Sequence, residues 1–276
     1  MNSISKPSIR SRGGHVTVNG IRLHYLALDT AGAANGSQPL ILIPGITSPA
    51  ITWSFVGHRL AEFTRVFIVD NRGRGLSSGG EKIGYLLEDY ALDTAGLIEA
   101  LGLEKPVVLG HSMGGRIAIK LASERPDLVG CMIAADPPVT GPGRRPYPIP
   151  LQWYIDGIEA ASRGEKEDTS SPILKHWSAE QLELRAEWLP TCDKAAIAAS
   201  HASFHEEEIH SLLPAIQCRS LLIYAENGNT VDEDDASEFV EAMEDCQSQR
   251  IDGVGHMIPW DDLDGFVGVV RNFVQN

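Results

Sequence analysis

A serine nucleophile is indicated by a Gly-x-Ser-x-Gly pentapeptide at residues 110–114, with Ser112 at its centre. An apolar run at residues 106–109 precedes it and a segment of helical period at residues 116–124 follows it, so the serine falls between a predicted strand and a predicted helix. This order is typical of a nucleophile elbow, whose sharp turn raises the serine hydroxyl to the end of the sheet. Its two glycines are needed because a Cβ at either place would collide with strand or helix. The alternative is a serine that only closes a tight turn.

A serine hydroxyl is a weak nucleophile at neutral pH and needs a base that a carboxylate orients. On an elbow of this kind the chain order is serine, acid, histidine. Of the nine histidines, His256 follows the last predicted strand, and the small residues before it let its loop reach Ser112. His111, inside the pentapeptide, is expected to be structural. We predict that His256 is the general base.

The acid has two candidates. Enzymes with this chain order usually take it from the loop after the strand at residues 221–225, as an Asp three residues beyond a glycine. Here Ala225 stands in place of that glycine and Gly228 in place of the acid. Glu226 lies on the same loop, and Asp136 ends the preceding strand. We favour Asp136 and keep Glu226 as the alternative.

Two backbone N–H groups are predicted to bind the oxyanion of a tetrahedral intermediate. The strand at residues 39–44 is followed by Gly45 and Ile46. In enzymes with a nucleophile elbow, the loop at this place supplies one donor, here the N–H of Ile46. The other donor is the residue after the nucleophile, Met113. The alternative is that Gly45 only permits a turn.

The rest of the chain predicts an α/β fold with a mostly parallel sheet, helices on both faces and an inserted helical cap. Residues 1–14 are expected to be a disordered tail, residues 15–140 and 211–276 the sheet domain, and residues 141–210 the cap. Asn19-Gly20 predicts a hairpin turn between strands at residues 15–18 and 21–28. Further strands are predicted at residues 39–44, 65–69, 106–109, 128–135, 220–225 and 249–251. Helices are predicted at residues 85–102, 116–124, 151–162, 178–189, 193–207, 234–244 and 262–274.

The composition argues against several classes of partner. The chain of 276 residues has 23 Lys and Arg against 37 Asp and Glu, a net charge of −14, which disfavours nucleic acid and anionic membranes. No apolar run approaches the roughly 20 residues of a membrane helix, and residues 1–14 lack the apolar core of a secretory signal. Scattered cysteines without metal-ligand spacing predict reduced thiols in a cytoplasmic protein and no metal site: Cys131, Cys192, Cys218 and Cys246.

Longer runs resemble a known family. Residues 45–53, 136–145, 184–189 and 255–266 are similar to the N-formylmaleamate deformylases of nicotinate catabolism, in the α/β-hydrolase superfamily, and the similarity extends over residues 16–273. The resemblance implies cofactor-free release of formate and maleamate by a triad of Ser112, Asp136 and His256. A related hydrolase of acetamidomethylene-succinate type shares the plan, so the resemblance leaves the substrate open.

An anionic substrate of this type requires a cation, best a planar guanidinium. The arginines of the cap and its start are the candidates, with three aromatic residues as walls or hydrogen-bond donors: Arg144, Arg145, Arg185, Tyr147, Trp53 and Trp260. Solvated or cap-anchoring side chains are the alternative. By contrast, Arg72 and Arg74, in the turn at residues 70–77, are expected to form a structural network.

Two rival functions remain open from the sequence. The first is another small amidase or a carboxylesterase, which would tolerate a neutral, wider pocket. The second is a hydrolase-like receptor that binds a small molecule and barely turns it over; an intact triad argues against it. The sequence carries no signal for an oligomeric state.

Overall fold

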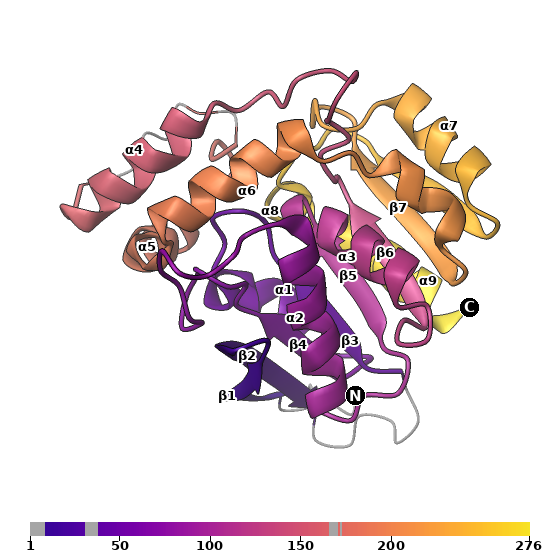
Figure 1. Cartoon of the computed structure of the whole chain (residues 1–276), viewed down its shortest axis with the longest axis horizontal. Coiled ribbons are helices and arrows are strands. Elements are labelled where there is room, and N and C mark those ends of the chain that lie inside the picture. The colour runs from indigo at the N-terminus through magenta and orange to yellow at the C-terminus, as the bar shows by residue number, and fades with distance from the viewer. Residues whose placement is uncertain (1–8, 31–37, 166–170, 172) are drawn as a thin grey trace, which may run out of the picture.

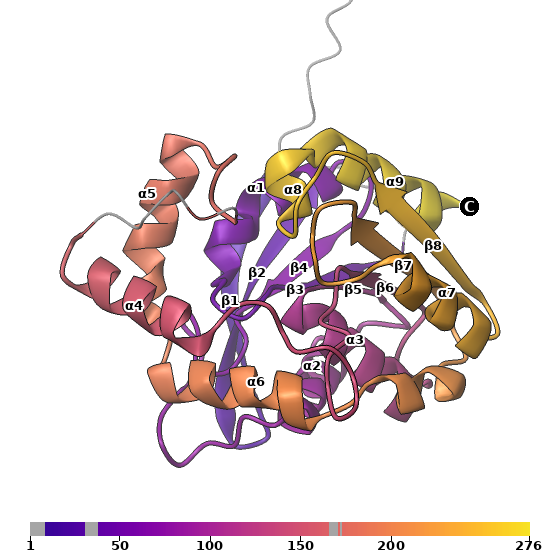
Figure 2. The same ribbon diagram turned by 90° about the horizontal axis from the view of Figure 1, so that it is seen from above.

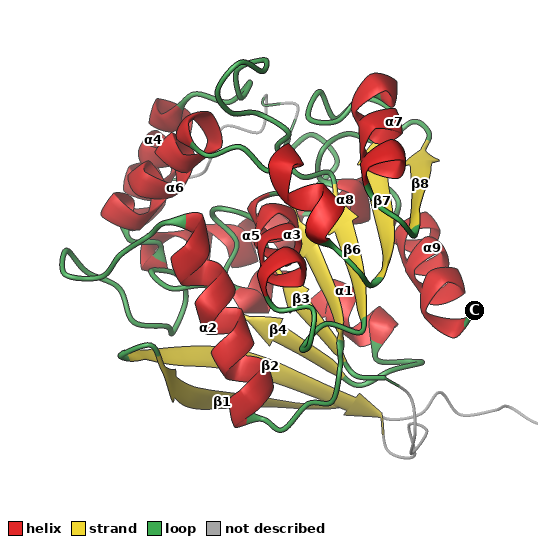
Figure 3. Cartoon of the chain, turned by 45° about the vertical axis from the view of Figure 1, so that its right-hand side comes forward, coloured by secondary structure: helices red, strands yellow, loops and turns green. Residues whose placement is uncertain are grey.

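One sheet of eight strands forms the centre of the molecule, in the order β1-β2-β4-β3-β5-β6-β7-β8 (Figure 3). The computed structural model describes residues 9–30, 38–165, 171 and 173–276. The strands are β1 (Ile9–Val18), β2 (Ile21–Thr30), β3 (Leu40–Ile43), β4 (Val66–Val69), β5 (Val107–His111), β6 (Cys131–Ala135), β7 (Arg219–Ala225) and β8 (Cys246–Ile251). All neighbours from β4 to β8 are parallel, and β1 and β2 are antiparallel to their neighbours. The predicted mostly parallel sheet is confirmed.

Helices cover both faces of this sheet. They are α1 (Ser54–Leu60), α2 (Leu87–Ala100), α3 (Met113–Glu124), α4 (Leu151–Ser162), α5 (Ala179–Trp188), α6 (Lys194–Glu206), α7 (Glu233–Ala242), α8 (Ile258–Asp261) and α9 (Leu263–Gln275), with short 3₁₀ helices η1 (Ala50–Trp53), η2 (Leu189–Thr191) and η3 (His210–Ala215). Figure 2 shows α1 and α9 on one side of the sheet and α2 and α3 on the other. None of the described helices combines the length and apolarity needed to cross a membrane.

Side chains alternate along the strands and pack into two hydrophobic cores, one on each face of the sheet. In β3, Ile41 and Ile43 pack into the core under α2 and α3, whereas Leu40 and Leu42 pack into the core under α1 and α9. All four side chains are fully buried. A continuous apolar strand is therefore required here, because neither face of the sheet meets water.

The segment between β6 and β7 leaves the sheet and forms α4, α5 and α6. Figure 1 shows α4 and α5 grouped on one side of the molecule, with α6 extending from them toward α3. The Ser200 hydroxyl of α6 bonds the Tyr90 hydroxyl of α2 (2.8 Å). At the start of α5 a capping box is present, because Ser178 and Gln181 exchange side-chain and backbone hydrogen bonds. This is the segment in which the sequence predicts a cap.

The N-terminal prediction needs a correction. Residues 9–14 belong to β1, which pairs with β2 along its whole length, so the predicted disordered tail is wrong for this part; residues 1–8 lie outside the described residues. The segment shows no apolar signal because β1 is an edge strand whose residues 10–13 are exposed and held by backbone pairing.

Elsewhere the predicted elements are found with ends displaced by at most three residues, and α1 and α8 were not predicted. The hairpin turn is confirmed, with positive φ angles at Asn19 (47°) and Gly20 (75°).

Candidate active site

Ser112 stands at the sharp turn between β5 and α3. Its backbone has φ 54° and ψ −120°, a strained conformation for a residue with a side chain. A Cβ on Gly110 would lie 1.9 Å from the carbonyl oxygen of Gly114, and a Cβ on Gly114 would lie 1.9 Å from that of Ile43. Both glycines are thus required by close backbone contacts, as the pentapeptide predicts.

Three side chains from distant parts of the chain meet at this turn. His256 Nε2 lies 3.0 Å from Ser112 Oγ, and His256 Nδ1 lies 2.6 Å from Asp136 Oδ2. Asp136 follows β6, is fully buried, and its other oxygen accepts a hydrogen bond from the Ala225 N–H (3.2 Å). The arrangement is that of a relay in which a carboxylate orients an imidazole toward a hydroxyl.

The same geometry accounts for the missing acid on the β7 loop. A Cβ on Gly228 would lie 2.7 Å from Asp136 Oδ2, so the Asp136 carboxylate occupies the space that a side chain at position 228 would need. The alternative acid, Glu226, is turned away from His256. It accepts a hydrogen bond from the Gly253 N–H (2.7 Å) and faces Arg250.

The two predicted oxyanion donors belong to segments that adjoin Ser112, because Met113 follows it in the chain and Ile46 follows Gly45. A Cβ on Gly45 would be 3.4 Å from the Cβ of Ser112, so the loop after β3 passes directly beside the serine. Within the described residues, neither the Ile46 N–H nor the Met113 N–H donates to a protein acceptor. The buried Arg74 holds the loop by donating to the Ile46 carbonyl (2.9 Å).

The turn at residues 70–77 is structural, as predicted. Besides its bond to the Ile46 carbonyl, Arg74 donates to the hydroxyls of Tyr90 (2.5 Å) and Ser200 (2.9 Å). Arg72 pairs with the buried Asp93 through two hydrogen bonds of 2.6 Å.

His111 supports the loop that carries His256. Its Nε2–H donates to the His256 carbonyl (2.8 Å), and its ring packs between those of Trp53 and His256. Complete burial, together with the nearby His256, lowers the pKa of His111 from 6.5 to about 3. His111 is therefore a neutral hydrogen-bond donor, in line with its predicted structural role.

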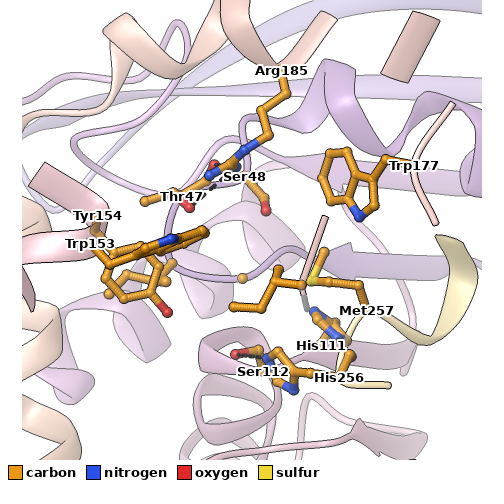
Figure 4. A pocket seen from close by; sticks show the side chains of 13 residues that line it. Thr47, Ser48, His111, Ser112, Trp153, Tyr154, Trp177, Arg185, His256 and Met257 are labelled. Atoms are coloured by element: carbon orange, nitrogen blue, oxygen red, sulfur yellow. Dashed lines mark hydrogen bonds between the residues drawn. The ribbon is translucent and has the colours of Figure 1, made fainter. Parts of the chain in front are cut away.

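A pocket opens above Ser112, between the sheet and the helices α4 and α5 (Figure 4). Arg185, from α5, lies at the end opposite Ser112, with its guanidinium 5.9 Å from the ring centre of Trp153 and 5.7 Å from that of Trp177. It also donates to the Thr47 carbonyl (3.3 Å). The lining consists of Gly45, Ile46, Thr47, Ser48, His111, Ser112, Trp153, Tyr154, Ile173, Trp177, Arg185, His256 and Met257. The pocket thus has the Ser112 hydroxyl at one end and a guanidinium group at the other.

Of the six predicted substrate contacts, the structure brings Arg185 into the lining of this pocket, whereas Tyr147 lines a neighbouring cavity that also borders His256. The Tyr147 hydroxyl bonds that of Tyr154 (2.8 Å) and lies beside the Ser112 hydroxyl. Burial raises the pKa of Tyr147 well above 10 and that of Tyr154 to about 12, so both hydroxyls keep their protons. Trp53 and Trp260 instead pack against each other behind the pocket, 4.9 Å between ring centres.

Arg144 and Arg145 lie outside the pocket, so their predicted substrate contact is not supported. They bind the carboxylates of Asp235 and Glu238 on α7, because the start of the cap passes along this helix. Among the described residues, His210, Asp235 and Glu238 hold ligand atoms within 4.8 Å of one another. The two guanidinium groups already supply positive charge to this cluster.

The sequence reasoning missed several pocket residues, among them Thr47, Tyr154 and Trp177. Each of them lies in or next to a segment that the sequence singles out. Thr47 follows the predicted oxyanion donor Ile46, and Tyr154 and Trp177 lie on the predicted cap. Which faces of that segment turn toward Ser112 depends on how the helices pack, and no local pattern encodes this.

The mostly parallel sheet and the sharp strand–turn–helix connection at Ser112 together define a hydrolase of the α/β class. The comparison with known families agrees, because the model of the alpha/beta hydrolase family matches residues 40–269, and the chain belongs to this family.

Within the family, the chain is similar to the N-formylmaleamate deformylase of Pseudomonas putida, with 46% identity over 96% of this chain and 97% of the relative. A solved structure of an N-formylmaleamic acid deformylase, also from Pseudomonas putida, superimposes with a TM-score of 0.86 and 41% identity, covering 94% of this chain and 100% of the other. The 2-(acetamidomethylene)succinate hydrolase of Mesorhizobium japonicum is 41% identical over 37% of this chain and 36% of the relative.

Proposed function

We propose that the protein is a cofactor-free serine hydrolase that cleaves the formamide C–N bond of a small anionic substrate, N-formylmaleamate, to give maleamate and formate. The observation that carries this proposal is one pocket that holds the Ser112–His256 pair at one end and Arg185 at the other. The extent of the similarity to the deformylase from Pseudomonas putida supports the choice of substrate.

Acylation begins when His256 Nε2 takes the proton of Ser112 and the serine oxygen attacks the formyl carbon. The oxyanion that forms is stabilised by the N–H groups of Ile46 and Met113; one such donor is typically worth about 2.7–4 kcal/mol in the transition state. The protonated His256 then gives its proton to the departing nitrogen, the C–N bond breaks, and maleamate leaves.

Deacylation repeats these roles with water as the nucleophile. His256 takes a proton from a water molecule, which attacks the formyl ester on Ser112. The second tetrahedral intermediate uses the same backbone donors. Return of the proton to the serine oxygen releases formate and restores the resting enzyme. Asp136 stays bonded to His256 Nδ1 throughout and stabilises the imidazolium.

Arg185 is the residue we assign to the substrate carboxylate. Its side chain is 6% exposed and is held between two indole rings, so the guanidinium presents a fixed planar fork to the pocket. The carboxylate belongs to the leaving half of the substrate. Its binding therefore places the C–N bond against Ser112.

The proposal is tested by comparing N-formylmaleamate with its methyl ester, which has the same shape without the charge, and with a neutral p-nitrophenyl ester. We expect formate release from the acid to be favoured, and Arg185→Gln to lower kcat/KM for the acid by about 10–100-fold while leaving the methyl ester nearly unchanged. The matched control is Arg144→Gln, which removes a guanidinium outside the pocket. Equal turnover of acid and methyl ester by the parent protein would contradict the proposal, and an acetamido analogue in the same panel reports whether larger acyl groups enter.

We further propose a cytoplasmic location and a role in nicotinate degradation. The location is supported by the four cysteines, which are all free. The pathway follows from the proposed substrate alone.

A further inference from the structure

His256 Nδ1 has a second neighbour that the relay does not use. The Thr230 hydroxyl oxygen lies 3.2 Å from this nitrogen, on the loop that follows β7. Thr230 is 3% exposed, so its hydroxyl is largely shielded from bulk solvent. The loop itself is fixed, because Arg145 donates to the Thr230 carbonyl (2.9 Å).

The protons at this point can be counted. A threonine hydroxyl has one proton, and that of Thr230 is donated to the Gly228 carbonyl (3.1 Å). It therefore presents a lone pair to His256 Nδ1, as Asp136 Oδ2 does from 2.6 Å. Two acceptors facing one ring nitrogen require that nitrogen to carry the hydrogen.

This requirement decides the state of the other ring nitrogen. Neutral imidazole has a single N–H, so a hydrogen on Nδ1 leaves Nε2 with the lone pair that must accept the proton of Ser112. In the opposite tautomer, bare Nδ1 would face two oxygen lone pairs. Thr230 could relieve that repulsion only by turning its proton away from the Gly228 carbonyl and giving up the hydrogen bond between them.

We propose that Thr230 is a positioning residue that, together with Asp136, holds His256 in the tautomer that activates Ser112. The inference rests on the Ser112–His256–Asp136 relay of the proposed function and is independent of the substrate. It assigns a chemical role to a loop whose usual acid is absent.

Two matched pairs of variants isolate the hydroxyl. The parent and Thr230→Val differ by an oxygen in place of a methyl group, and Thr230→Ser and Thr230→Ala differ only by the presence of the oxygen. The readouts are the rate at which a fluorophosphonate probe labels Ser112, with Ser112→Ala as the unlabelled control, and the NMR resonance of the proton on His256 Nδ1.

We expect the member of each pair with a hydroxyl to be labelled about tenfold faster, and Thr230→Ser to retain the Nδ1 proton resonance of the parent protein. Equal labelling rates within both pairs would overturn the proposal, as would a Thr230→Ser protein as slow as Thr230→Ala. If Thr230→Val does not fold, as judged by thermal melting, the Ser and Ala pair alone decides. Because labelling does not depend on the natural substrate, failure to release formate leaves this test intact.

Discussion

At the scale of single residues, the environment of the Asp136 carboxylate is tightly constrained. One oxygen accepts from His256 Nδ1 and the other from the Ala225 N–H, and the backbone has a positive φ of 47°. Such strain persists only where surrounding structure fixes it. Here the adjoining Asp136 N–H bonds the Ile223 carbonyl (2.7 Å), which ties the residue to β7.

The identity of the acid can be tested by paired amide variants. Asp136→Asn keeps the shape but offers Nδ1 the wrong partner, so we expect kcat to fall by about 10⁴-fold. Glu226→Gln is the matched control, and we expect it to stay within a few-fold of the parent because Glu226 bonds the Gly253 N–H and not His256. Steady-state formate release measures both. Near-normal turnover by Asp136→Asn would show that Asp136 is not the acid that orients His256.

A second residue-scale prediction concerns pH and His111. Its pKa is about 3 in the folded protein, against 6.5 ordinarily, so below pH 6.5 the unfolded chain binds a proton that the folded chain refuses. Protonation therefore favours unfolding as the pH falls from 6.5 toward 3, by up to about 1.4 kcal/mol per pH unit.

Urea unfolding of the parent and of His111→Gln at several pH values checks this. Glutamine can still donate to the His256 carbonyl but does not titrate. We expect the stability of the variant to depend less steeply on pH between 6 and 4, whatever its stability at neutral pH. Parallel pH dependences for the two proteins would show that His111 is not the group responsible.

At the scale of elements, the elbow depends on how closely α3 approaches β3. A Cβ on Gly114 would lie 1.9 Å from the Ile43 carbonyl oxygen and 2.9 Å from that of Pro44. These are backbone atoms that cannot rotate away, so α3 must shift if the Cβ is added. Because Met113 begins α3, any shift also moves a proposed oxyanion donor.

We therefore expect Gly114→Ala to lower the free energy of unfolding by at least about 1–3 kcal/mol and to reduce kcat strongly. Gly268→Ala is the matched control in α9, where an added Cβ meets no atom within 4 Å. There we expect a gain of up to about 1 kcal/mol from helix propensity and unchanged activity. Urea denaturation and formate release measure both; a Gly114→Ala protein as stable and active as the parent would contradict the close contact.

The elements that the sequence predicts well are those with a local physical signal. Ser112 and its two glycines can be predicted because the sharp turn tolerates few residue types. Asn19-Gly20 can be predicted because its positive φ angles favour these two residues. The absence of an acid at Gly228 directs attention to Asp136, whose carboxylate lies 2.6 Å from His256 Nδ1. β1 was underestimated because an edge strand with a solvated face carries no apolar alternation in residues 10–13.

At the scale of the whole molecule, the pocket lies between the carboxyl ends of the strands and the inserted helices. Ser112 and His256 come from loops of the sheet, whereas Arg185, Trp153 and Trp177 come from the insertion. Residues 141–210 are therefore the segment we propose as the cap. In the proposed function, this segment brings a cation and apolar walls to the Ser112 hydroxyl, which the sheet positions.

The arginines illustrate why this level is hard to predict from sequence. Arg144, Arg145 and Arg185 have the same chemistry and lie in or next to the same segment, so composition cannot separate them. The packing does separate them: the first two meet acidic residues of α7, and the third enters the pocket. The positions of these arginines along the sequence do not show which of them faces the pocket, because that depends on how the inserted helices pack.

The most direct test of the account is formate release from N-formylmaleamate by the parent protein and by Ser112→Ala, measured side by side after thermal melting has established that both are folded. The account predicts many formate molecules per parent chain and a loss of about 10⁶-fold in kcat for Ser112→Ala. No formate from the parent protein, or turnover by Ser112→Ala close to that of the parent, would contradict it.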